Sequence, residues 1–160
     1  MKALVNILKE QLIEYKTLLD IAEKKQQVLI GNDIKELDRL NKEEHTIIIH
    51  ITKLENQRLE IVNRLSEVWG VETEFIALKE IAGKAQEPYK SELNIIFTEL
   101  NEIVERLNKI NHENSSLIEQ ALQIVHFTID TLTRAEREVV YPQKEGKNLQ
   151  QSSRIFDSKA

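Results

Sequence analysis

The chain has 160 residues, a formal net charge of −5 and no cysteine. These values exclude a disulfide framework and a thiolate metal site, and they argue against the basic surface of a nucleic-acid-binding protein. Only 5% of the residues are aromatic, and glycine and proline are rare, whereas 41% are hydrophobic. This composition predicts one all-α domain built of a few long helices rather than a sheet.

The N-terminal stretch and the longest apolar runs bear on localisation. Charged residues at positions 2, 9 and 10 interrupt the N-terminal stretch too early for a signal peptide. No apolar run approaches the roughly 20 residues of a membrane span. We therefore expect a cytoplasmic protein without membrane insertion.

The first predicted helix covers about residues 2–30. Gly31 suits the left-handed position after a helix, and Asp33 with Glu36 resembles a capping box that opens the next helix. Because this turn is short, the second helix runs antiparallel to the first. The apolar seam of the first helix has Gln26 as its only polar member and otherwise consists of Val5, Leu8, Leu12, Tyr15, Leu19, Ala22 and Leu29.

The second predicted helix covers about residues 34–69 and ends at Gly70. Its seam is apolar except at Glu44 and Arg58. The isoleucines at 47–49 and 51 spread around more of the circumference than a hairpin needs, which predicts that this part contacts helices on two sides.

A short helix, about residues 74–82, is predicted to close the end of the bundle. Thr73 is its expected N-cap and Gly83 its expected terminator. The apolar residues that would close the bundle end are Phe75, Ile76, Leu78 and Ile81.

The longest predicted helix covers about residues 88–138, with Pro88 at its first position. Asn114 is the only polar residue of its seam. It either fixes the register of the helices, as a buried polar residue does in coiled coils, or is a core asparagine with its hydrogen bonds satisfied and no partner role. The seam consists of Leu93, Ile96, Leu100, Ile103, Leu107, Ile110, Asn114, Leu117, Ala121 and Ile124.

These elements predict an antiparallel bundle or coiled coil of three long helices plus one short helix. The bundle domain would comprise residues 1–138 and a flexible C-terminal tail residues 139–160, because Pro142 stops the helix and the following residues are polar.

Enzymatic motifs are missing from the sequence. The four histidines lack the spacing of a di-iron or zinc helix site, and no glycine-rich phosphate loop or nucleophile motif occurs. Solvated histidines and ordinary charged helix faces account for these residues. We therefore predict that the protein is not an enzyme and binds no cofactor and no metal. The alternative, a helical-bundle enzyme with a metal or cofactor, predicts metal in the purified protein.

The last predicted helix is longer than either of the two long helices before it, and this mismatch in length predicts a binding surface. If it starts beside the end of the second helix, the hairpin covers it to about residue 124, and about 14 residues, on the order of 20 Å, project beyond. An uncovered apolar stripe would bind a partner protein, pair with a second chain or be covered by the tail. The stripe consists of Ile118, Leu122, Val125, Ile129 and Leu132.

Several blocks resemble the FlgN-type flagellar export chaperones. Residues 18–24, 28–29 and 33–37, followed by Thr52 to Arg58, resemble the N-terminal hairpin of the family. Residues 107–118 are similar to the Asn-x-x-Asn segment on the family's last long helix, and residues 155–159 to the end of many members.

The resemblance implies a cytoplasmic, ATP-independent chaperone that holds the hook–filament junction proteins FlgK and FlgL before type III export. A C-terminal region of the chaperone would capture a helical terminal segment of the client, here through Ile118, Leu122, Val125, Ile129 and Leu132. A tyrosine near the C-terminus would dock on the export gate, and Tyr141 is the tyrosine of that region. The alternative function is a structural coiled-coil protein that self-assembles, for instance as a homodimer, without a client.

Overall fold

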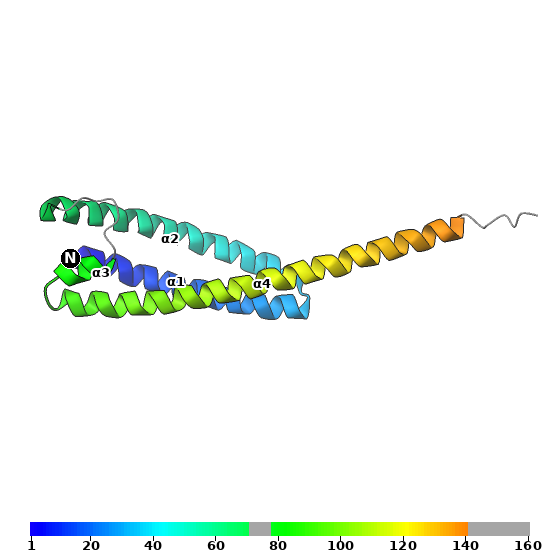
Figure 1. The fold of residues 1–160 in the computed structure, drawn as a ribbon, viewed down its shortest axis with the longest axis horizontal. Coiled ribbons are helices and arrows are strands. Elements are labelled where there is room, and N and C mark those ends of the chain that lie inside the picture. The colour runs from blue at the N-terminus through cyan, green and yellow to red at the C-terminus, as the bar shows by residue number, and fades with distance from the viewer. Residues whose placement is uncertain (71–77, 141–160) are drawn as a thin grey trace, which may run out of the picture. The chain divides into compact units, whose positions relative to one another are not determined.

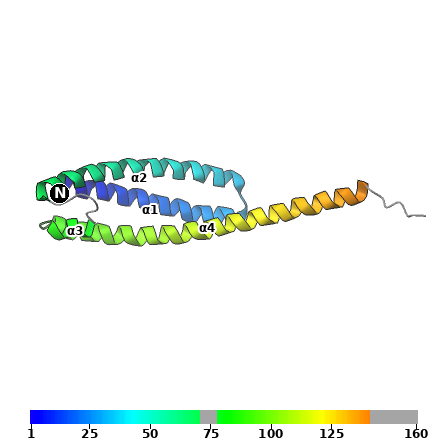
Figure 2. The ribbon, with the colours of Figure 1, turned by 45° about the horizontal axis from the view of Figure 1, so that its top comes forward.

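The computed structural model of the chain describes residues 1–70 and 78–140. The described residues form four helices: α1 (Lys2–Gly31), α2 (Ile34–Trp69), α3 (Leu78–Lys84) and α4 (Tyr89–Val140). This confirms the predicted all-α fold of three long helices and a short one. The chain divides into two units, Met1–Ala121 and Leu122–Ala160. In the first unit α1 and α4 run in the same direction, and α2 runs back in the opposite direction (Figures 1 and 2).

The helix ends follow local capping chemistry. The Asp33 carboxylate accepts a hydrogen bond from the backbone N–H of Glu36 and so caps α2, as predicted. Gly70 closes α2 in the left-handed region, with φ 63°. At the end of α1, however, the left-handed residue is Asn32, with φ 54°, and Gly31 is the last helical residue. Asparagine tolerates this conformation better than other non-glycine residues, which explains the shift by one position.

Two further predicted helix ends are wrong in detail. Gly83 lies inside α3, which ends at Lys84. Pro88 precedes the first residue of α4, and its carbonyl accepts a hydrogen bond from the N–H of Glu92. The Glu87 carboxylate accepts hydrogen bonds from the N–H and the hydroxyl of Ser91, which caps the start of α4. Thr73, Phe75 and Ile76 lie outside the described residues.

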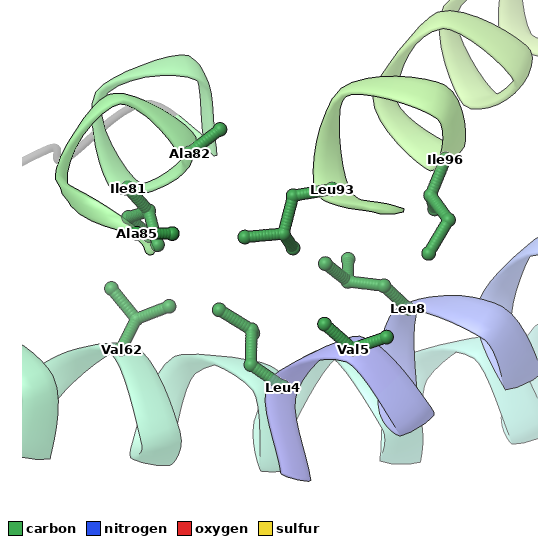
Figure 3. Close-up of a cluster of buried hydrophobic side chains, with 9 residues drawn as sticks. All are labelled: Leu4, Val5, Leu8, Val62, Ile81, Ala82, Ala85, Leu93 and Ile96. Atoms are coloured by element: carbon green, nitrogen blue, oxygen red, sulfur yellow. The ribbon is translucent and has the colours of Figure 1, made fainter. Parts of the chain in front are cut away.

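The main core lies where the N-terminal end of α1 meets α2, α3 and the first turns of α4. Figure 3 shows Leu4, Val5 and Leu8 of α1 directed toward Ile81 of α3 and Leu93 of α4. Burial of these aliphatic side chains supplies the main favourable free energy of folding. A second core cluster, formed by α1 and α4, continues the packing along the two helices and contains Leu12, Leu19, Ala22, Ile103 and Leu107.

Three ion pairs at constant spacing join α1 to α4. Lys9 pairs with Glu92 at 3.1 Å, Lys16 with Glu99 at 2.7 Å and Glu23 with Arg106 at 2.7 Å. Each pair is separated by 83 residues in sequence. A constant separation means that the two helices run parallel in a fixed register, and the step of seven residues is the heptad of a coiled coil. We call these three pairs the charge ladder.

The polar seam residues of α2 find partners on α1 or on their own helix. Glu44 pairs with Lys25 at 2.8 Å, and both side chains are mostly buried. The guanidinium of Arg58 donates two hydrogen bonds to Glu55, which also accepts one from the buried side chain of Gln11. Polar contacts therefore replace apolar packing in the middle of α2.

The isoleucine run of α2 does not lie between two helices. Ile48 and Ile49 are exposed, while Ile47 and Ile51 are only partly buried. The second core cluster contains residues of α1 and α4 and none of α2. The predicted contact of this stretch with helices on two sides is therefore wrong.

Candidate functional site

The candidate site is the apolar stripe of α4, formed by five residues that all lie on described parts of the helix. At 3.6 residues per turn, their side chains fall within an arc of about 80° on one face. All five are exposed, with relative accessibilities between 40% and 61%. The α4 stripe, a name kept below, comprises Ile118, Leu122, Val125, Ile129 and Leu132.

The transition from buried to exposed residues along α4 occurs early. Leu107 and Asn114 are buried, Leu117 is partly buried, and Ile118 is exposed. The hydrogen bond from Gln26 to Glu113, followed for five more residues along the two parallel helices, places Gly31, the end of α1, level with about residue 118. The packing partner of α4 in the first unit therefore ends near residue 118, and the predicted cover to residue 124 is too long. The sequence estimate used the length of α2, whereas α4 packs along the shorter α1.

Charge is unusually sparse around the α4 stripe. Of the twenty residues from 115 to 134, only Glu119, Asp130 and Arg134 are charged, against 31% of the whole chain. An exposed helix normally carries a wide charged face. The few charges and the apolar arc together are typical of a surface that is covered in a complex.

Threonine hydroxyls in this segment bond to their own helix. Those of Thr128, Thr131 and Thr133 each donate to the carbonyl four residues earlier, at 2.8 Å. Such a hydroxyl already has a hydrogen-bond partner, so an apolar surface can cover the threonine without leaving the donor unpaired. The segment is thus suited to contact with apolar side chains over more than the five stripe residues.

Two exposed apolar residues extend beyond the stripe. Ile124, expected on the bundle seam, is exposed, and Phe127, which lies on neither predicted apolar stripe, is 73% exposed. Helical geometry places Phe127 roughly opposite the stripe. The available signal in the sequence was a large aromatic residue in a segment with few charges.

Asn114 marks the buried end of the α4 seam. Its side-chain Nδ2 donates a hydrogen bond of 3.0 Å to the carbonyl of Ala22, whereas its buried Oδ1 has no hydrogen-bond partner among the described residues. One turn of α1 further on, the Gln26 side chain donates to Glu113 at 2.7 Å. Both contacts join α1 to α4 just before the stripe begins.

Ionisable groups offer no second site in the described parts of the chain. All four histidines are exposed. Within residues 1–70 and 78–140, no group of three or more histidine, aspartate or glutamate side chains is placed to hold a metal ion. Helices in these ranges also lack the combination of length and apolarity that crossing a membrane requires. Tyr141 lies outside the described residues.

The comparisons with known proteins agree with the resemblance of the sequence. The family model described as FlgN protein matches residues 1–148. The chain is also 28% identical over 161 residues to YvyG of Bacillus subtilis (strain 168), an uncharacterised protein, and the match covers 99% of this chain and 98% of that protein. No solved structure matches the chain.

Proposed function

The chain belongs to the FlgN family, and on this premise we propose that it captures FlgK and FlgL through the α4 stripe in the cytoplasm and delivers them to the flagellar type III export apparatus. The family implies a flagellar export chaperone for FlgK and FlgL, and it is not a family of enzymes. The capture surface, the delivery step and the cellular location are our proposal.

The observation that carries the proposal is the exposed, low-charge face of α4. An amphipathic helix binds another helix through residues at i, i+3, i+4 and i+7, which is the spacing of the α4 stripe. Burying a few hundred Å² of apolar surface contributes several kcal/mol, at about 25 cal/mol per Å², before the cost of ordering the client. Such binding hides an aggregation-prone client segment and still allows release.

The proposal is tested by substituting charges into the stripe. We expect Val125→Asp with Ile129→Asp to abolish binding of purified FlgK and FlgL in isothermal calorimetry, because two buried carboxylates would lack partners. Helicity and melting temperature should stay near the wild-type values, because both residues are exposed. Phe127→Asp is the matched control, since Phe127 is in the same segment on the opposite face.

Two results would contradict the proposal. Equal loss of binding with Phe127→Asp would mean that the stripe is not the specific contact face. A loss of folding in the double variant would mean that the stripe is core. The alternative, a self-assembling coiled coil, predicts in sedimentation equilibrium a dimer that depends on Val125 and Ile129, together with no binding of FlgK or FlgL.

Docking on the export gate is a separate step, which we assign to Tyr141 from the family resemblance. We expect Tyr141→Ala to bind FlgK and FlgL with unchanged affinity but to reduce their secretion in a flagellated strain. Reduced affinity for the clients would instead place Tyr141 in the client-binding surface.

A further inference from the structure

The middle of α2 is packed differently from its two ends. Leu40, near the start of α2, is 1% exposed, and Val62, near its end, is 6% exposed and belongs to the main core. Between them, from residue 41 to residue 61, none of the residues is fully buried. We call residues 41–61 the α2 middle segment. Close packing therefore holds α2 at two separate levels, with a long stretch between them.

Polar contacts join the α2 middle segment to α1. Glu44 pairs with Lys25 at 2.8 Å, and Glu55 accepts a hydrogen bond of 3.0 Å from Gln11. The attraction within a mostly buried ion pair is largely offset by the hydration that both charges lose, and a hydrogen bond likewise replaces bonds to water. These contacts therefore add little net stability to the closed segment.

One buried apolar side chain of α1 depends on this segment for its cover. Ile21 is 5% exposed, although it belongs to neither core cluster of the described residues. It precedes Lys25 by one turn, so it lies on the face of α1 that contacts α2. Because α1 and α2 run antiparallel, the α2 residues opposite Ile21 lie between Glu44 and Glu55, within the middle segment.

The local sequence of the segment also favours the helix weakly. Six of the seven residues from 46 to 52 are isoleucine or threonine, whose β-branched side chains lose rotamer freedom in a helix. The hydroxyls of Thr46 and Thr52 donate to the carbonyls four residues earlier, at 3.1 and 2.8 Å, a contact that slightly destabilises helices. Helix propensity and tertiary packing are thus weak at the same place.

We propose that the α2 middle segment opens away from α1 as a strap, while both ends of α2 stay packed, and so uncovers Ile21. A stretch with few buried apolar contacts opens locally at a lower free-energy cost than the whole fold. During the opening α1 stays in place, since another of its faces packs on α4 through the second core cluster. The open form gives the first unit an apolar site that the closed form hides. This inference does not depend on the proposed function.

Thiol reactivity tests the opening at two equally buried positions. The chain has no cysteine, so each variant carries one thiol. Ile21 is 5% exposed and Leu19 is 7% exposed, but Leu19 belongs to the cluster formed by α1 and α4. We expect the Ile21→Cys thiol to react with DTNB about tenfold faster or more than the Leu19→Cys thiol, since local opening is enough to expose it. Urea denaturation of both variants corrects for any difference in global stability.

Hydrogen exchange of the unchanged chain is an independent readout, and it decides the question if a cysteine variant folds poorly. Amides of residues 45–58 should exchange faster than those of residues 62–66, at the packed end of α2, and of residues 9–22 of α1. Lys25→Leu with Glu44→Leu should slow the exchange of residues 45–58, because apolar contacts then join the segment to α1. The matched control is Asp38→Leu with Lys42→Leu, at an exposed pair, which should change that exchange little.

Three outcomes would overturn the inference. Equal reactivity of well-folded variants at positions 21 and 19 would mean that only global unfolding exposes Ile21. Exchange of residues 45–58 as slow as that of residues 9–22 would mean that the segment stays closed. Equally fast exchange over residues 45–66 would mean that the whole helix comes away rather than a strap held at both ends. Client binding by the α4 stripe is tested separately, through Val125→Asp with Ile129→Asp.

Discussion

Asn114 is buried where α4 packs on α1, and only one of its two side-chain polar atoms is paired. The Nδ2 bond to Ala22 contributes about 1 kcal/mol, while the unpaired Oδ1 costs about 1–3 kcal/mol in a buried position. The carbonyl of Ala22 also lies within a helix, so it does not depend on Asn114. Both interpretations of the sequence, a register-fixing residue and a satisfied core asparagine, stay predictions, although the unpaired Oδ1 means that the side chain is only half satisfied.

Replacing this residue with an apolar one should therefore stabilise the protein. We expect Asn114→Leu to raise the free energy of unfolding by about 1–2 kcal/mol in urea denaturation, because the unpaired oxygen is removed. Ile118→Leu, at an exposed site one turn further on, is the control and should change it little. A destabilised Asn114→Leu variant would show that the Ala22 bond outweighs the unpaired oxygen.

The carboxylate of Glu55 is another residue whose partners decide its chemistry. Hydrogen bonds from Arg58, opposed by partial burial and helped by a hydrogen bond from Gln11, lower the pKa of Glu55 below its ordinary value of 4.5. Burial first, and then the charge of Glu55, raise the pKa of Tyr15 on the facing helix. The folded state thus favours a charged Glu55 and a neutral Tyr15.

The lowered pKa of Glu55 predicts how the stability of the protein depends on pH. Stability due to Glu55 is fully present above pH 4.5 and is lost as the pH falls through the lower pKa of the folded state. As the pH is lowered below 4.5, we expect the melting temperature of the Glu55→Gln variant to fall less steeply than that of the wild type. If the melting temperatures of the two proteins fell in parallel with pH, Glu55 would not be the group responsible. Glu60→Gln is the control, because Glu60 belongs to an exposed ion pair on α2.

At the scale of the helices, the charge ladder specifies the register of α1 against α4. The first two pairs have lysine on α1 and glutamate on α4, whereas the third reverses the signs. A slip of one heptad in one direction would oppose Lys16 to Arg106, and a slip in the other would oppose Glu23 to Glu99. Either slip brings like charges together, so the reversal disfavours both alternative registers.

Reversing one pair of the ladder tests this role. We expect Lys16→Glu to lower stability by at most about 1 kcal/mol, because the pair is exposed and screened, and the second change Glu99→Lys to restore it. A double-mutant cycle in low salt measures the coupling. Absence of coupling would mean that apolar packing alone sets the register. The control is the Lys42–Asp38 pair, which lies within α2 and joins no two helices.

At the scale of the whole molecule, burial is concentrated at the end where α3 meets the N-terminus of α1. Both ends of the described α4 are helical, but their surroundings differ. Leu93 and Ile96 are in the main core, whereas Leu122 to Leu132 are exposed. Helical hydrogen bonds without tertiary cover open at a smaller free-energy cost than those under a packed core.

Hydrogen exchange should therefore differ along this one helix. In the free protein, amides of residues 122–134 should exchange faster than those of residues 96–107, and added FlgK or FlgL should slow the fast group selectively. Uniform slow exchange over both ranges in the free protein would mean that a second chain or the tail already covers the stripe.

The sequence by itself determined the features that depend on neighbouring residues. The heptad spacing of apolar residues predicted three long helices, and Asp33 and Gly70 predicted helix ends, because capping needs only the residues within one turn. The α4 stripe was also visible as a periodic pattern, and its residues are exposed on one face, although their binding role stays a prediction.

Only the tertiary structure decided how far the helices overlap. The level at which α1 ends along α4 depends on how Leu4, Val5 and Leu8 pack with α3 and Leu93, and no local rule contains that level. The same packing left Ile48 exposed and gave Glu44 and Arg58 polar partners. Periodicity identifies the apolar face of a helix. How much of that face stays exposed depends on where the packing partner ends, and only the assembled core determines that point.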